Sequence, residues 1–313
     1  MPKELPTVLI SLDDEDPQFA VVEKFETQWR HRKNVYRPWW MRVPFFFILR
    51  FAAPASFFSV IYIYNKFGMM LYRYFDSDSV IMFWLVFYDF EIISNWIQLQ
   101  RDRSNVNENF PILKALPQQC LKSQCHVCHI SRPLRVHHCP ICDYCVWRRD
   151  HHCFLLGLCI GQFNHANFIF IMVYTTLASI TYMYYCIQFM RIEYPFSGWY
   201  YLLCFALYGL TVSDVVTSTQ FTVLVVFNMA LFMAVALALF AAFHVYLVKT
   251  NDTMQDFAFW LSMKHFQKMD PYKYLPQPPL FQKMIFGPSP ILRFFFPFWA
   301  PKIHEYFTFE KII

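Results

Sequence analysis

Four apolar stretches, separated by polar segments, divide the chain. A helix that crosses the hydrocarbon core of a bilayer needs about 20 mostly apolar residues. The stretches that approach this length are residues 44–64, 79–98, 166–190 and 215–248. The last two contain no Asp, Glu, Lys or Arg, so the pattern predicts four transmembrane helices.

The first two stretches carry charge in their interior. Arg50 lies about two helical turns from the basic edge of its stretch, so its side chain can extend to the membrane surface. Asp89 and Glu91 are expected to face the bundle interior and to pair with Arg50, because unpaired charge in lipid is costly. A shorter apolar run, residues 199–210, is expected to form a membrane-surface or re-entrant helix.

Basic residues indicate the orientation of the chain in the membrane. Lys and Arg concentrate in the N-terminal segment, in the loop between the second and third spans, and in the tail. Because cytosolic loops are enriched in Lys and Arg, all three are predicted to be cytosolic. The predicted divisions are a cytosolic segment 1–42, two spans in 43–98, a cytosolic domain 99–165, two spans with a lumenal loop in 166–248, and a cytosolic tail 249–313. The aromatic and proline-rich tail is expected to pack on the cytosolic domain.

Composition agrees with a membrane protein. The 313 residues are 57% hydrophobic and 16% charged, whereas soluble domains carry about 25% charge. This composition excludes intrinsic disorder, and the N-terminus does not resemble a signal peptide. The basic residues flank spans instead of forming a dedicated patch, which argues against nucleic-acid binding.

Seven of the ten cysteines lie in one window, residues 125–159. In the cytosol thiols stay reduced, so clustered cysteines there are metal ligands or catalysts more often than disulfides. The spacing Cys-x2-Cys, which brings two sulfurs to one ion, occurs at 125/128, 139/142 and 142/145. Two Cys3His zinc sites would use six cysteines and two histidines, which leaves one cysteine over.

Local chemistry favours Cys153 as the remaining cysteine. It follows Asp150 and His151, so a carboxylate, an imidazole and a thiol occur within four residues. An imidazole that accepts the thiol proton activates the sulfur, and a carboxylate orients the imidazole. The residue types alone leave open the alternative that Cys153 is a metal ligand.

The window lies just before the third predicted span, which places a nucleophile at the cytosolic membrane face. There it could meet an amphiphile whose tail lies in the bilayer. Basic side chains in the loop could attract phosphates, although for each one singly a cytosolic position is the better explanation. They are Arg132, Arg135, Arg148 and Arg149.

This pattern resembles the cysteine-rich domain of the DHHC protein S-acyltransferases, also called palmitoyltransferases. The shared positions are Cys125, Cys128, Arg132, Pro133, Arg135, His138, Cys139, Cys142, Cys145, Asp150, His151, His152, Cys153, Cys159, Asn164 and Phe168. The resemblance implies an all-α integral membrane protein with four transmembrane helices and a cytosolic zinc-binding domain of short β-hairpins and loops.

The resemblance also implies the chemistry. Cys153 would take a palmitoyl group from palmitoyl-CoA as a thioester and pass it to a cysteine of a membrane-associated protein, with His151 as general base oriented by Asp150. Arg132 and Arg135 would lie near the CoA phosphates. One structural zinc would be held by Cys125, Cys128, His138 and Cys145, and a second by Cys139, Cys142, His152 and Cys159. Four-span members occur mostly in the Golgi and endoplasmic reticulum.

The chain departs from the family pattern at three places. Phe154-Leu155 replaces the usual Pro-Trp, which suggests a smaller, atypical subgroup. The Asp-Pro-Gly motif is not visible, and Thr-Thr-x-Glu is reduced to Thr253-Met254-Gln255-Asp256. Because these motifs are thought to brace the active site, slow turnover or an accessory subunit is an expectation. The alternative functions are a catalytically weak zinc-stabilised membrane scaffold and a transporter that uses Asp89 and Glu91.

Overall fold

The computed structural model describes residues 52–75, 79–107, 123–132, 135–193, 217–263 and 290–297, and the statements below concern these ranges. Several sequence-based expectations fall outside them. They concern the N-terminal segment 1–42, Arg50, the side chain of Arg132, the apolar run 199–210 and most of the tail 249–313.

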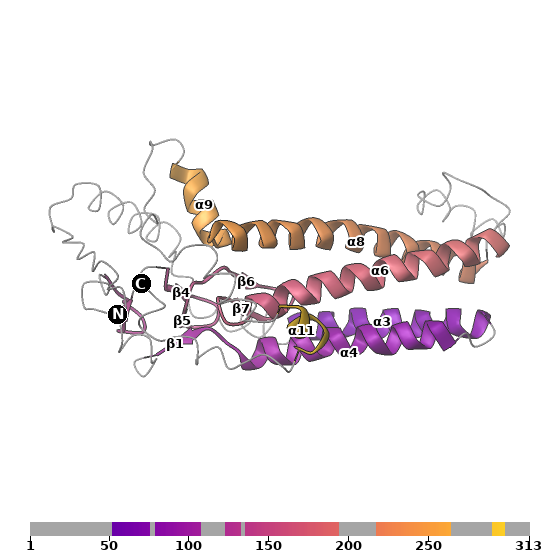
Figure 1. The fold of residues 1–313 in the computed structure, drawn as a ribbon, viewed down its shortest axis with the longest axis horizontal. Helices are drawn as coiled ribbons and strands as arrows, with labels where there is room; N and C mark the ends of the chain where they lie inside the picture. The colour runs from indigo at the N-terminus through magenta and orange to yellow at the C-terminus, as the bar shows by residue number, and fades with distance from the viewer. Residues whose placement is uncertain are drawn as a thin grey trace, which may run out of the picture.

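Four long helices run side by side and form the body of the molecule (Figure 1). They are α3 (Ala53–Tyr74), α4 (Ser79–Arg101), α6 (His165–Glu193) and α8 (Ser218–Thr250). Three of the described helices are long and apolar enough to cross a membrane: Ser79–Arg101, His165–Glu193 and Thr219–Thr250. The chain thus has three candidate spans in the described ranges, and the fourth stays a prediction.

The helix α3 differs from the expected first span. The sequence placed a span at residues 44–64, whereas the helix runs from Ala53 to Tyr74 and so continues ten residues beyond that stretch. Asn65, Lys66 and Arg73 all lie within the helix, and their polarity lowers its hydropathy below that of the other three.

Polar residues define both ends of α8. Thr217 accepts a hydrogen bond from the backbone N–H of Gln220, whose side chain in turn accepts one from the Thr217 backbone. This reciprocal capping satisfies donors that have no partner within the helix. At the other end Asn251 adopts a left-handed conformation with φ 62°, which stops the helix and turns the chain into α9 (Met254–Met263).

A chain of buried polar side chains links α4, α6 and the short helix α11 (Pro290–Phe295). The Asn167 side chain donates to Asn95 at 3.1 Å and accepts from the guanidinium of Arg293 at 2.9 Å. Phe294 stacks on Tyr174 of α6. The described part of the tail therefore packs on the long helices through α11. Glu91, expected to face the interior, is 1% exposed.

Short antiparallel sheets form the region at one end of the long helices, before α6 (Figure 1). The strands are β1 (Asn105–Val106), β2 (Ser123–Gln124), β3 (Ser131–Arg132), β4 (His137–Cys139), β5 (Tyr144–Val146), β6 (His151–Cys153) and β7 (Leu158–Ile160). They pair as β1-β5-β4, β2-β3 and β6-β7. The expected cysteine-rich region of short hairpins is confirmed.

Candidate active site and metal centres

The cysteine-rich region consists of three successive hairpins that repeat every 14 residues. Their first strands, β2, β4 and β6, begin at residues 123, 137 and 151. In each hairpin a cysteine ends or follows the first strand, and its carbonyl accepts a hydrogen bond from the backbone N–H four residues later. These bonds join His129 to Cys125 at 2.8 Å, Asp143 to Cys139 at 2.8 Å, and Gly157 to Cys153 at 2.9 Å.

The backbone of the three turns is also alike. The donor residues His129, Asp143 and Gly157 have φ values of 56°, 59° and 69°. This left-handed conformation is costly for residues other than glycine, and Asp and His adopt it more often than most. In the first two turns the N–H of the second cysteine of Cys-x2-Cys faces the first sulfur at 3.4 Å. Each hairpin thus forms the same tight turn, at residues 125–129, 139–143 and 153–157. We call this turn a knuckle.

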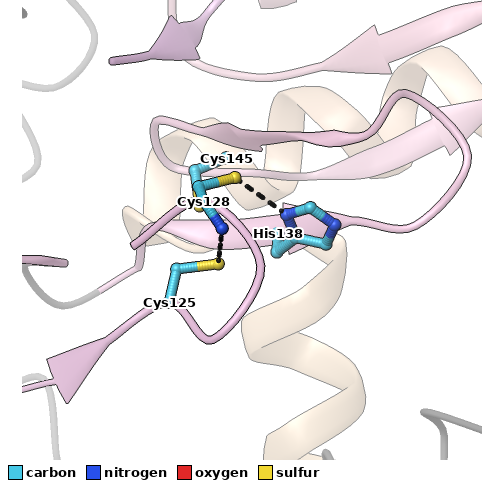
Figure 2. A group of neighbouring side chains, drawn as sticks. All are labelled: Cys125, Cys128, His138 and Cys145. Carbon is cyan, nitrogen blue, oxygen red and sulfur yellow. Dashed lines mark hydrogen bonds between the residues drawn. The ribbon is translucent and has the colours of Figure 1, made fainter. Parts of the chain in front are cut away.

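The first knuckle meets the second hairpin to form one group of four ligands, shown in Figure 2. Cys125 and Cys128 come from the knuckle. His138 and Cys145 are directly opposite each other in the β4–β5 pairing. The Cys128 sulfur lies 3.2 Å from the Nδ1 of His138.

The second knuckle meets the third hairpin in the same way. Cys139 and Cys142 come from the knuckle, and His152 and Cys159 are opposite each other in the β6–β7 pairing. The Nδ1 of His152 lies 3.2 Å from the Cys142 sulfur and 3.7 Å from the other two sulfurs. The pattern Cys-x2-Cys-x9-His-x6-Cys therefore occurs twice, offset by one hairpin. This repeat can be read from the sequence alone.

Both groups have the donor chemistry of structural zinc sites. Each supplies three sulfurs and one imidazole nitrogen, and the four ligand atoms of each lie within 4.8 Å of one another. Ligands placed tetrahedrally around one Zn²⁺ at about 2.0–2.3 Å have mutual distances of this size. The Nε2 of His138 also faces the Asp143 carboxylate at 3.7 Å, as expected for the outer nitrogen of a zinc-bound histidine.

The third hairpin repeats the knuckle but lacks its second cysteine. Cys153 occupies the position of Cys125 and Cys139, whereas Leu156 occupies the position of Cys128 and Cys142. Leu156 is 2% exposed and packs in the core between the long helices and the hairpin. Among the described residues Cys153 belongs to neither ligand group, and its side chain is half-buried.

Asp150 and His151 lie beside Cys153 and interact strongly. The Oδ2 of Asp150 lies 2.6 Å from the Nδ1 of His151, and the carboxylate is fully buried. Burial alone would lower the pKa of the His151 imidazole, but its hydrogen bonds with Asp150 and Cys153 raise the pKa to about 9. Burial alone would raise the pKa of Asp150, but the His151 hydrogen bond and the charges of nearby histidines hold it well below its usual range.

The segment after α8 braces Asp150 from outside the hairpins. The backbone N–H of Met254 donates to the Oδ1 of Asp150 at 2.8 Å. Thr253 and Asp256 cap the start of α9 reciprocally, at 2.9 and 3.2 Å. The reduced motif Thr253-Met254-Gln255-Asp256 therefore retains a contact with the candidate active site.

Of the two arginines expected near the CoA phosphates, the structure describes the side chain of Arg135. Arg135 is 5% exposed, and its guanidinium lies 3.3 Å from the Asp256 carboxylate and donates to the Asn251 carbonyl at 2.8 Å. Arg148 also donates to the carbonyl and side chain of Asn251. Arg132 lies in β3, and its side chain is outside the described part of the chain. Arg135 thus joins the hairpins to the α8–α9 junction.

A cavity of about 450 Å³ lies beside the second ligand group, between that group, the start of α3 and the end of α4. His152, Trp96 and the two arginines Arg101 and Arg103 line it. Basic residues at the end of a span are common, so the sequence does not distinguish these two arginines.

Two histidines that the sequence analysis missed also lie at the site. His165 begins α6, and His244 lies in the apolar stretch of α8; both are fully buried. The Nδ1 of His244 lies 2.9 Å from the Nε2 of His165 and 3.9 Å from the Oδ2 of Asp150. Nothing in the spacing of these two residues, 79 positions apart, indicates that they meet.

Comparison with known proteins identifies the family of this region. Residues 118–261 match the family model described as DHHC palmitoyltransferase. The match includes both ligand groups, Asp150, His151 and Cys153, and it extends through α6 and α8 into α9. No curated protein matched the chain.

Proposed function

Since the chain carries a DHHC palmitoyltransferase domain over residues 118–261, we propose that it is a protein S-acyltransferase with Cys153 as its nucleophile. The observation that carries the proposal is the third knuckle, because it presents a sulfur in the geometry of a metal ligand without the second cysteine of a site. That sulfur is half-buried beside an imidazole that is already paired with a carboxylate.

In the first step the Cys153 sulfur attacks the thioester carbonyl carbon of palmitoyl-CoA. The proton of the thiol resides on His151, whose Nδ1 is engaged with Asp150 and whose Nε2 remains for the sulfur. The carbon–sulfur bond to CoA breaks, and CoA leaves as a thiol when it takes this proton. The palmitoyl group is then held as a thioester on Cys153.

In the second step a cysteine thiol of a membrane-associated protein attacks the Cys153 thioester. His151 accepts the proton of the incoming thiol, and the proton returns to the Cys153 sulfur as the acyl bond breaks. Atoms balance over the two steps, because one thioester is consumed and one is formed. Asp150 keeps the imidazole in the orientation that both steps require.

The two ligand groups would hold two structural zinc ions, which would supply folding energy and fix the register of the hairpins. Because all four ligand positions of each ion come from the protein, neither ion would have an open position for chemistry. Arg132 and Arg135 are candidates for contacts with the CoA phosphates. Arg135 is already paired with Asp256, so Arg101 and Arg103 beside the 450 Å³ cavity are further candidates.

The candidate spans support a site for this chemistry at a membrane surface. We propose a cytosolic active site in a Golgi or endoplasmic reticulum membrane, with the acyl chain among the long helices. The Lys- and Arg-rich loop and tail support this orientation. An accessory subunit stays an expectation from the altered motifs.

The proposal is tested by incubating the purified full chain with palmitoyl-CoA and measuring a hydroxylamine-sensitive acyl group by mass spectrometry. We expect the label on Cys153 of the wild type and its loss in Cys153→Ser. Cys186→Ser is the matched control, because Cys186 is a buried cysteine of α6 outside both ligand groups. A folded wild type with two bound zinc ions and no label would favour the scaffold function. A label that persists in Cys153→Ser would show that another thiol is the nucleophile.

A further inference from the structure

His244 lies against the candidate active site from the membrane side of the fold. Its Nδ1 is 3.9 Å from the Oδ2 of Asp150, the same oxygen that is hydrogen-bonded to His151. It is held there by a 2.9 Å hydrogen bond with His165 and by the rings of Phe168 and Phe240. The side chain is 0% exposed, so water does not compete for these contacts.

The position of the His244 proton follows from its surroundings. Its Nε2 is buried and has no hydrogen-bond partner within the described part of the chain. A buried N–H without an acceptor is costly, whereas a buried acceptor without a donor is tolerated more often. An unprotonated Nε2 is such an acceptor. The favourable tautomer therefore carries its proton on Nδ1, where the N–H donates to His165 and faces the Asp150 carboxylate.

N–H groups from both sides of the fold then face Asp150. The Nδ1 of His151 lies 2.6 Å from its Oδ2 and the Met254 N–H donates to its Oδ1 at 2.8 Å, whereas the Nδ1 of His244 is 3.9 Å from its Oδ2, too far for a hydrogen bond. In a buried site the positive end of the His244 N–H still favours the charged carboxylate, because no water screens the two groups. Two of these three N–H groups come from α8 and the segment that follows it.

We propose that His244 is a positioning residue for acyl transfer, which acts through its Nδ1–H on Asp150 and thereby on His151 and Cys153. The proposal rests on the proposed function for its effect on turnover. His165 orients the His244 ring by accepting the hydrogen bond of this N–H. Removal of the N–H would remove its electrostatic attraction for the Asp150 carboxylate and leave Asp150 less fixed, so the His151 imidazole would be oriented less well toward the sulfur.

Three substitutions separate the donor from the bulk of the ring. The amide of Asn places an N–H where the imidazole has Nδ1, whereas the longer Gln places it near the position of Nε2. His244→Leu keeps an apolar side chain of similar size and removes the donor. Tyr246→Leu, on the same helix with a 54% exposed side chain, is the matched control.

Each variant is purified as the full chain and measured in two ways. The first is the kcat and KM of acyl transfer from palmitoyl-CoA. The second is the rate at which iodoacetamide alkylates Cys153, followed on its peptide by mass spectrometry, which needs no acyl transfer. Bound zinc and the melting temperature show whether the variant is folded.

We expect His244→Leu and His244→Gln to lower kcat and the alkylation rate by about 10- to 100-fold, the effect of losing an outer-shell orienting partner, with KM unchanged. His244→Asn and Tyr246→Leu should stay close to the wild type. The proposal is overturned if His244→Leu equals the wild type, or if His244→Asn loses as much as His244→Leu. If the wild type transfers no acyl group, the proposed function fails, and the alkylation rates still decide the role of His244.

Discussion

The carboxylate of Asp150 accepts a hydrogen bond from the backbone N–H of Met254, 104 residues further along the chain, at 2.8 Å. This bond joins the third hairpin to the start of α9. It depends on the reciprocal cap between Thr253 and Asp256, which orients the first N–H groups of that helix. The geometry of the site is therefore determined partly by a segment outside the cysteine-rich region.

Asp256→Asn is predicted to destabilise the protein and to lower acyl transfer. The substitution removes the negative partner of Arg135, and breaking a buried ion pair costs about 3–5 kcal/mol. Asp252→Asn is the control, because Asp252 lies farther from Arg135, at 3.8 Å, and is more exposed, so the change should cost less than about 1 kcal/mol. Unfolding of the two variants in detergent measures the difference; equal losses would contradict the assigned pairing.

Leu156→Cys is predicted to complete a third Cys-x2-Cys knuckle and to allow a disulfide with the nucleophile Cys153. The new thiol would occupy the position that Cys128 and Cys142 have in the other two hairpins. Under mild oxidation a disulfide with Cys153 should abolish palmitoyl labelling, and a reductant should restore it.

Two controls accompany this variant. Leu156→Ala removes at least as much apolar volume without adding a thiol, and Leu155→Cys places a thiol at the neighbouring, 45% exposed position. Both should keep their labelling under the same oxidation. If Leu156→Cys does so too, the third hairpin does not have the knuckle geometry in solution.

Cys139→Ala is predicted to reduce the zinc content from two ions to one and to lower the melting temperature, because structural zinc supplies folding energy. Cys186→Ala should retain both ions, since Cys186 lies in α6 outside the two groups. Metal analysis of the purified variants gives the stoichiometry directly. Two zinc ions in Cys139→Ala would disprove its assignment as a ligand.

Acyl transfer is predicted to decline as pH rises through about 9, the raised pKa of His151, because the imidazolium then loses the proton that the leaving thiol takes. The contribution of the Asp150–His151 pair to the stability of the fold also declines as pH rises. It is fully present below the ordinary histidine pKa of about 6.5 and is lost between there and pH 9. In Asp150→Asn the decline in rate should move to lower pH, and a pH–rate profile that does not move would exclude this pairing.

The sequence by itself determined the elements whose signal is local. Charge-free apolar stretches predicted α6 and α8 within a few residues, because a long apolar run has no stable place outside a membrane or a core. The count of seven clustered cysteines against two Cys3His sites predicted one remaining thiol. The resemblance to the DHHC family assigned the ligand sets, and the structure brings the same eight residues together.

Only the tertiary structure decided which residues meet across long separations. The cross-strand registers placed His138 opposite Cys145 and His152 opposite Cys159. The backbone hydrogen bond from Gly157 to Cys153 identified a third knuckle, which lacks a second cysteine. The contacts of His244 with Asp150 and His165, and the burial of Arg135 beside Asp256, have no counterpart in local spacing. Periodicity and spacing report on neighbours along the chain, whereas these contacts arise from the packing of α8 and α9 on the hairpins.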